Sequence, residues 1–347
     1  MKRKKQPFHL AQLDHLDGNE RTKLLKQASK LRKMALAHGG RKSSLGDLLG
    51  EMTRPAAPVP TSSVPELVTW VGPKTAQVGG READLNGYRL AVGDYAHVSE
   101  FEDRFRVVGL QDRRTKLSRP DVQNENLERV IVANIDVVVI VVSVVTPPLH
   151  PRLIDRYLVA VQMGGAAPMI VVNKTDLMDE IELAEELQKI APYSVLDVPI
   201  LAVSVETGQG MDALRESLAG KTCAFVGHSG VGKSSLANGL FPDLALKVGG
   251  LMRGHGRGAH TTTTSSLFDV GNGTKLIDTP GIRSFGLGKL SRLELQGAFP
   301  EFDRFACRFR DCSHRHEPGC GVKTAVESGE VYRERYETFL RLLEEVG

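Results

Sequence analysis

The segment Gly227–Ser234, which reads GHSGVGKS, restricts the fold of this 347-residue chain more than any other feature. It follows the apolar run CAFV and precedes the helical pattern SSLANGLF, which is the strand–loop–helix context of a P-loop. The glycines let the backbone curl so that several N–H groups point at one phosphate, and the following helix N-terminus adds partial positive charge. Lys233 is expected to reach the β- and γ-phosphates, and the Ser234 hydroxyl is expected to bind Mg²⁺. The residues predicted to line this phosphate site are Gly227, His228, Ser229, Gly230, Val231, Gly232, Lys233, Ser234 and Ser235.

The tetrapeptide NKTD, which begins at Asn173, predicts the base of the nucleotide. It directly follows the run MIVV, at the carboxyl edge of the predicted sheet, where α/β proteins bind ligands. The Asp176 carboxylate can accept hydrogen bonds from N1–H and N2–H₂ of guanine, and adenine has neither donor there. Asn173 is expected to fasten the loop and the Lys174 stem to cover the base, with Thr175 in the same loop. NKTD alone fits an ordinary strand-to-helix turn equally well, but beside a P-loop it favours guanine.

Three further stretches fit a guanine-nucleotide site. The stretch SVETG closes the run LAVS, where a backbone N–H near Val205 would meet guanine O6 and Ser204 would brace the loop. Asp278 ends the run KLID and would bind Mg²⁺ through water, while the Gly281 N–H senses the γ-phosphate. In the hydroxyl-rich stretch GHGRGAHTTTTSS, Thr262 is expected to complete the Mg²⁺ shell of the triphosphate state. Loss of the γ-phosphate would then release this loop, as in the order–disorder switch of GTPases.

The spacing of apolar runs predicts an α/β domain over residues 123–289. Strands are expected at Val137–Val142, Met169–Val172, Ile200–Val203, Cys223–Val226 and Lys275–Ile277, with helical patterns between most of them. The base motifs precede the P-loop along the chain, whereas ordinary GTPases place the phosphate loop first. We therefore expect a circularly permuted P-loop GTPase domain, a rearrangement that requires only that the parental chain ends lie close together.

The flanking residues predict three further segments. Residues 1–65 form a basic N-terminal extension and a Pro-rich linker, and the first fifty of them carry twelve Lys/Arg against four Asp/Glu. Such a tail fits an anionic partner such as RNA, although a solvated arm has the same composition. Residues 66–122 hold short apolar runs separated by turn residues, which is typical of a small all-β barrel or sandwich. Residues 290–347 contain a Cys/His-rich stretch and one expected helix from about Lys323 to Val346.

Three of the four cysteines, with a nearby histidine, predict a metal site. Cys307, Cys312 and Cys320 lie within fourteen residues, a spacing that favours metal ligation in a reducing cytoplasm over a disulfide framework. With His314 they make a closed tetrahedral set for one structural Zn²⁺ per chain. His316 is an alternative fourth ligand on spacing alone.

In this order, the segments resemble those of the small ribosomal subunit biogenesis GTPase (RsgA) family. The resemblance rests on the stretches LSRP, NKTDL, GHSGVGKSSL, HTTT and DTPGIRSFGL and on the CxHxxxxxC spacing, between about Glu66 and Val346. It implies an OB-fold barrel, GTP hydrolysis to GDP stimulated by the 30S ribosomal subunit, contact with 16S rRNA, and a role in late subunit maturation. It also implies that His314 is the fourth zinc ligand and that His260, just before the threonine run, serves hydrolysis.

Hydrolysis is the activity for which alternatives remain open. Many GTPases place a Gln just after DxxG to orient the attacking water, and here that position is Ile282, so intrinsic hydrolysis is expected to be slow. His260 would orient water instead, or it contacts only RNA or solvent. A second interpretation is a nucleotide-gated RNA-binding module with negligible catalysis. A third is a P-loop kinase or ATPase, which Asp176 disfavours.

The sequence also predicts the surroundings in which the chain works. The start MKRKKQPFHL has no apolar stretch after its basic cluster, and the most apolar segment, Val130–Val145, is too short to span a bilayer. We therefore expect a cytoplasmic monomer that is not attached to a membrane. RNA contacts are expected from aromatic and arginine residues of the barrel, several of the aromatics being core residues. These candidates are Trp70, Tyr88, Tyr95, Phe101, Phe105, Arg81, Arg89, Arg104 and Arg106.

Overall fold

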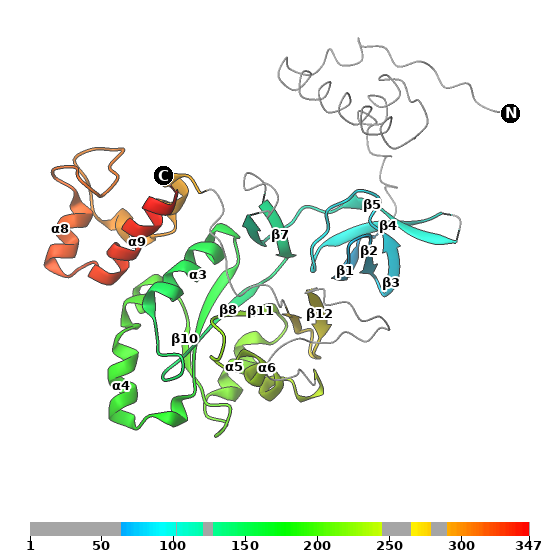
Figure 1. The fold of residues 1–347 in the computed structure, drawn as a ribbon, viewed down its shortest axis with the longest axis horizontal. Helices are drawn as coiled ribbons and strands as arrows, with labels where there is room; N and C mark the ends of the chain where they lie inside the picture. Colours follow the sequence, from blue (N-terminus) through cyan, green and yellow to red (C-terminus); the bar gives the residue numbers. More distant parts are fainter. Residues whose placement is uncertain (1–63, 102, 121–127, 245–264, 279–289, 347) are drawn as a thin grey trace, which may run out of the picture. The chain divides into compact units, whose positions relative to one another are not determined.

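The computed structural model describes residues 64–346, apart from 102, 121–127, 245–264 and 279–289. Five of its strands are parallel and lie side by side in the order β10-β9-β8-β11-β13, close to the ranges predicted from the sequence. Their bounds are β8 (Val137–Ser143), β9 (Ala167–Asn173), β10 (Ile200–Ala202), β11 (Thr222–Val226) and β13 (Lys275–Asp278). The helices between them are α3 (Pro151–Met163), α4 (Glu180–Gln188), α5 (Met211–Leu218) and α6 (Lys233–Leu240) (Figure 1).

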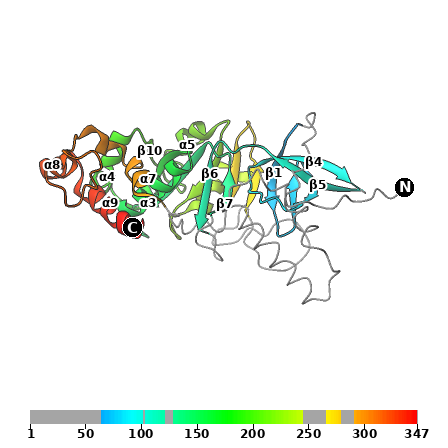
Figure 2. The same cartoon turned by 90° about the horizontal axis from the view of Figure 1, so that it is seen from above.

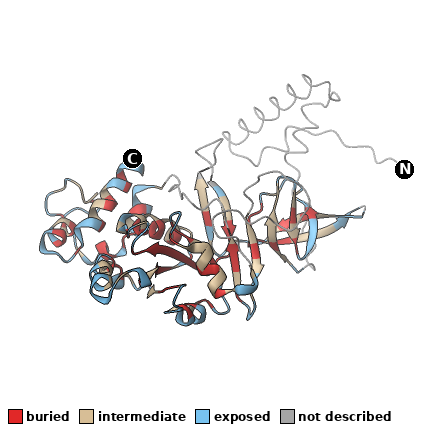
Figure 3. Cartoon of the chain, turned by 60° about the horizontal axis from the view of Figure 1, so that its bottom comes forward, coloured by how far each residue is buried: buried red, intermediate tan, exposed pale blue. Residues whose placement is uncertain are grey.

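Burial on both faces explains why the central strands are almost purely Val and Ile. Every residue of β8 (VVVIVVS) is buried, and Figure 3 shows the strands of this sheet mostly in the buried colour. Alternate residues of a strand point to opposite faces. Ile140 therefore joins a core with Ile154 and Leu158 of α3, while Val139 joins a second core that includes Leu214 of α5. A strand covered by helices on both faces reads as a continuous apolar run.

The residues before this domain form the predicted small barrel. Its strands are β1 (Glu66–Val71), β2 (Thr75–Val78), β3 (Arg81–Asp84), β4 (Tyr95–Phe101) and β5 (Arg104–Leu110). They follow one another in the order β1-β2-β3-β5-β4, and pairing of β1 with β4 closes the ring around a core that includes Val68 and Val107. This confirms the expected OB-like barrel.

Two connections join the barrel to the α/β sheet. Strand β1 pairs with β12 (Ser266–Asp269), an antiparallel neighbour of β13, through Trp70 and Ser266. Between the two domains in the chain, β6 (Lys116–Pro120) and β7 (Glu128–Ala133) form a two-stranded ribbon, which Figure 2 shows next to the sheet. The permuted α/β domain is thus hydrogen-bonded to the barrel.

The C-terminal part is helical, but the expectation of one helix from about Lys323 to Val346 is wrong. Two helices occupy this region, α8 (Gly321–Ser328) and α9 (Arg333–Val346). Gly329 ends α8 in a left-handed conformation with φ +81°, which glycine adopts at little cost. With α7 (Arg292–Gly297) and the 3₁₀ turn η5 (Pro300–Arg304), these helices enclose a separate core around Phe299 and Phe339.

The fold class expected from the sequence is therefore confirmed: a barrel, a permuted α/β domain and a small helical domain with a Cys/His cluster. Within the described ranges, the helices are all too short or too polar to cross a membrane. His260, Thr262 and Gly281, and almost all of the predicted basic extension, lie outside the described residues.

Candidate nucleotide site and metal centre

The phosphate loop connects the end of β11 to the start of α6. Gly232 has a φ of +93°, and a Cβ at this position would lie 2.3 Å from Nδ2 of Asn173, so only glycine fits. The Lys233 ammonium group donates hydrogen bonds to the carbonyl oxygens of Gly227 and His228, both at 2.7 Å. The lysine side chain is thereby folded back along the curl of the loop, where a P-loop lysine meets phosphate. Ser234 and Ser235 follow in the first turn of α6 and are partly exposed.

The base loop begins where β9 ends. Asn173 is buried, Lys174 has a left-handed backbone with φ +65°, and Thr175 opens the 3₁₀ turn η2 (Thr175–Leu177). The Thr175 hydroxyl donates to the carbonyl oxygen of Val203 at 3.0 Å, which fixes the loop to the neighbouring strand. Asp176 stays exposed, so its carboxylate is accessible to a ligand.

Hydrogen bonds tie the three predicted nucleotide loops together. Asn173 Nδ2 donates to the carbonyl oxygen of Val231 in the phosphate loop at 2.9 Å. Ser204 Oγ donates to Asp176 Oδ1 at 2.6 Å and accepts from the Thr207 backbone N–H at 3.1 Å. Because the carboxyl ends of parallel strands meet at one edge of a sheet, residues 28 to 58 positions apart in sequence come together there.

One buried acceptor at this edge has no partner. Asn173 Oδ1 is inaccessible to solvent and makes no hydrogen bond, although the other end of the same amide is bonded. A buried polar atom without a partner is costly, and this one lies where the base and phosphate loops meet. With the exposed Asp176 carboxylate and the Lys233 ammonium group at the same sheet edge, the residues present fit a guanine nucleotide.

Asp278 marks the predicted magnesium side of the site. It ends β13, which pairs in parallel with β11, so it reaches the same sheet edge as the phosphate loop. Val205 follows Ser204 in its loop, and its side chain packs partly buried against the core on one face of the sheet. The predicted contacts of Asp278 with Mg²⁺ and of the Val205 backbone with guanine stay predictions.

Sequence reasoning missed the segment that connects β8 to α3. The Lys174 ammonium group donates to the carbonyl oxygen of Thr146 at 2.6 Å, and Ser143 Oγ donates to that of Pro147 at 2.7 Å. A Cβ at Gly230 would lie 3.5 Å from Pro147 Cδ, so the segment also adjoins the phosphate loop. The available signal was its position: it follows the most apolar strand, at the sheet edge where ligands bind.

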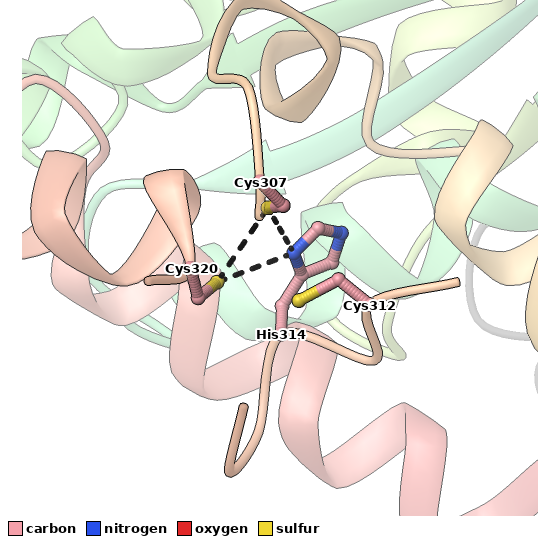
Figure 4. Close-up of side chains that lie close together, drawn as sticks. All are labelled: Cys307, Cys312, His314 and Cys320. Carbon is pink, nitrogen blue, oxygen red and sulfur yellow. Dashed lines mark hydrogen bonds between the residues drawn. The ribbon is translucent and has the colours of Figure 1, made fainter. Parts of the chain in front are cut away.

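The three cysteines and His314 form the second candidate site (Figure 4). One ligand atom from each of the four lies within 4.8 Å of all the others. Cys307 and Cys320 Sγ are 3.8 Å apart, and each lies 3.5 Å from His314 Nδ1. Two thiolates on a tetrahedral Zn²⁺ with bonds of about 2.3 Å would be about 3.8 Å apart. Of the two candidate histidines, His314 lies with the three cysteines and His316 is not part of the cluster, so the geometry favours His314 as the fourth ligand.

Burial and hydrogen bonds act differently on the four candidate ligands. Burial lowers the pKa of His314, which favours the neutral imidazole that ligation requires. Burial raises the pKa of the Cys312 and Cys320 thiols. At Cys307, hydrogen bonds from the backbone N–H groups of Val322 and Gly321 and from the other two thiols together outweigh burial and lower the pKa. Glu317 Oε1 accepts from the Ser313 backbone N–H at 2.9 Å and shapes the loop that carries the ligands.

The fold and the nucleotide site together define a circularly permuted P-loop GTPase. The sequence profile of the family described as RsgA GTPase matches residues 110–288. The chain is 43% identical over 239 residues to the small ribosomal subunit biogenesis GTPase RsgA of Pseudomonas fluorescens, and this aligned stretch covers 68% of this chain and 69% of that protein. The protein of the same name from Chromohalobacter salexigens is 43% identical over 241 residues, covering 69% of each.

Solved structures agree with this assignment. YjeQ from Thermotoga maritima superposes with a TM-score of 0.66 and 32% identity, covering 81% of this chain and 97% of that one. YloQ, described as a circularly permuted GTPase, shares the fold with a TM-score of 0.62 and 24% identity, covering 84% of this chain and 98% of its own. The chain belongs to the RsgA GTPase family, and it is a P-loop GTP hydrolase.

Proposed function

We propose that this chain hydrolyses GTP to GDP while bound to the 30S ribosomal subunit, contacts 16S rRNA, and assists a late step of small-subunit maturation. The relatives are named small ribosomal subunit biogenesis GTPases, which supports this assignment. The observation that carries it is the hydrogen bond from Asn173 to Val231, since it joins the base and phosphate loops at one edge of the sheet. We place the activity in the cytoplasm, in a monomer.

At this edge the Asp176 carboxylate selects guanine, and the hydrogen bond from the Ser204 hydroxyl at 2.6 Å fixes the orientation of the carboxylate. Lys233 binds the β- and γ-phosphates. Mg²⁺, held by Ser234 and Thr262, would supply positive charge to the phosphates. His260 orients the water that attacks the γ-phosphate. Ile282 cannot orient this water, because its side chain has no hydrogen-bonding group.

We assign the Cys₃His cluster to one structural Zn²⁺ per chain. Four protein ligands leave no open position for a substrate or water, which is the arrangement of structural rather than catalytic zinc. Held this way, the ligand loop and the start of α8 form a rigid unit that carries Arg308, Arg310 and Arg315.

The barrel offers the RNA a surface of arginine–aromatic pairs. The Arg106 guanidinium lies over the Phe101 ring at 4.6 Å, and the Arg81 guanidinium over the Phe105 ring at 4.7 Å. Phe101 is 52% exposed, so its ring is accessible to a base. Such pairs combine a phosphate-binding charge with a ring on which bases stack.

The proposal is tested by measuring GTP turnover with and without purified 30S subunits. We expect stimulated turnover at saturating GTP, with ATP neither competing nor being hydrolysed. Binding of GTP without stimulation would favour the nucleotide-gated RNA-binding module, and tighter binding of ATP than of GTP would revive the kinase or ATPase interpretation.

His260→Ala is expected to retain GTP affinity while losing stimulated turnover, because it removes the water-orienting group but no nucleotide contact. Sedimentation with 30S subunits and a non-hydrolysable GTP analogue is the control. If the variant binds 30S subunits more weakly and keeps its turnover at saturation, His260 contacts RNA instead.

A further inference from the structure

A buried network of charged and polar groups joins the C-terminal helices to the GTPase domain. Arg335 of α9, Asp155 of α3, Glu301 of η5 and Tyr193 of η3 (Ala191–Leu196) are between 1% and 7% exposed. Arg335 Nη1 lies 2.7 Å from Asp155 Oδ1, and Arg335 Nε donates to Glu301 Oε1. The Tyr193 hydroxyl lies 2.8 Å from Asp155 Oδ1.

Two aromatic rings, in addition to the two carboxylates, restrict the position of the Arg335 guanidinium. Its guanidinium also lies over the Phe299 ring at 4.6 Å and near the Tyr193 ring at 5.7 Å. Buried charges persist only with well-placed partners, and removing one partner leaves the other uncompensated. The three charged side chains therefore fix how α9 lies against α3.

This network reaches the N-terminus of α3 through Tyr193. Its hydroxyl lies 2.8 Å from the carbonyl oxygen of Pro151, the first residue of α3, as well as from Asp155 one turn later. Pro151 directly follows the segment between β8 and α3, whose Thr146 carbonyl accepts from the Lys174 ammonium group at 2.6 Å. One hydroxyl thus connects the Arg335 network to the first residue of α3, five residues after the Thr146 carbonyl that accepts from the base-loop lysine.

We propose that Arg335 is a positioning residue for guanine-nucleotide binding: through Asp155 and Tyr193 it fixes the start of α3 and hence the Thr146 carbonyl that orients Lys174. This inference rests on the proposed role of Lys174 at the guanine base. By linkage, nucleotide binding then stabilises the docking of α9 to the same extent that docking tightens nucleotide binding. A partner that pulls on the C-terminal domain would change the affinity for GDP.

Tyr193→Phe tests the connection, because it removes the hydroxyl and keeps the ring. We expect the Kd for a fluorescent GDP analogue, titrated into the full chain, to rise roughly 3- to 10-fold, the effect of one lost hydrogen bond. In a Lys174→Ala background the same change should have almost no further effect, since the two act through one contact. A merely structural role for Tyr193 would not produce this dependence on Lys174.

Glu345→Gln is the matched control. Glu345 forms an exposed ion pair with Arg156 between the same helices, α3 and α9, at 2.8 Å, and its loss should leave the Kd unchanged. Unchanged GDP affinity in Tyr193→Phe, or an equal loss with and without Lys174, would overturn the inference. If Tyr193→Phe does not fold, Arg335→Lys gives the same test, because a lysine cannot serve both carboxylates. Absence of GDP binding by the unaltered chain would instead refute the proposed function.

Discussion

Replacing Gly232 with alanine should break the contact between the base and phosphate loops. The backbone at this position has a φ of +93°, and the new Cβ would lie 2.3 Å from Asn173 Nδ2. Real Cβ atoms do not approach other atoms so closely, so the Asn173 amide must move. Its hydrogen bond to the Val231 carbonyl oxygen would then be lost.

The size of the effect follows from two contributions. A left-handed conformation costs a non-glycine residue about 1–2 kcal/mol. Leaving the buried Asn173 amide and Val231 carbonyl without each other costs about 1–3 kcal/mol more. We therefore expect Gly232→Ala to lower the free energy of unfolding by about 2–5 kcal/mol and to abolish measurable GDP binding.

Gly220→Ala separates the two contributions. Gly220 also has a left-handed backbone, with φ +69°, but a Cβ there would meet no atom within 4 Å. Only the backbone cost of about 1–2 kcal/mol should remain, with GDP affinity intact. Urea unfolding followed by circular dichroism, together with titration of a fluorescent GDP analogue, measures both quantities. Equal effects of the two substitutions, or normal GDP binding by Gly232→Ala, would refute the role of the Asn173 contact.

Two further predictions concern the base and the metal loop. Asp176→Asn should weaken GDP binding by roughly 10²- to 10⁴-fold, because two hydrogen bonds to a charged group are lost. It should also shift the preference toward xanthosine diphosphate, whose C2 oxygen can accept a hydrogen bond from the new amide. Competition titration measures the preference, and a retained preference for GDP would contradict this prediction. Hydrogen bonds from the Ser313 hydroxyl and from backbone N–H groups hold the pKa of Glu317 well below its ordinary value, so its stabilising effect is complete above about pH 4.3 and is lost as the pH falls further. The difference in melting temperature between the unaltered chain and Glu317→Gln should accordingly stay constant from pH 8 to pH 5 and shrink below about pH 4; a difference that grows toward acid would contradict this.

The sequence was informative wherever one local rule determined the outcome. The Val/Ile runs predicted the parallel strands, since only a strand covered on both faces is so uniformly apolar. Glycine spacing and strand–loop–helix context located the phosphate loop, and the cysteine spacing located the metal cluster.

Contacts between segments far apart in the chain could not be predicted from the sequence. Asp155, in the helical stretch PRLIDRYLVA, has the sequence pattern of a surface charge. In the fold it is buried and paired with Arg335, which is 180 residues away in sequence. Spacing alone left His314 and His316 equivalent, and their positions in the folded loop separate them. The break at Gly329 was missed because the helical pattern continues on both sides of it.

A crystal structure of the chain with GDP and Mg²⁺ tests the central claim most directly. We predict guanine N1 and N2 within about 3 Å of the Asp176 carboxylate and the β-phosphate against the backbone of residues 227–234, in one continuous pocket. Phosphates bound in that loop with the base directed away from Asp176, or GDP bound elsewhere, would contradict it.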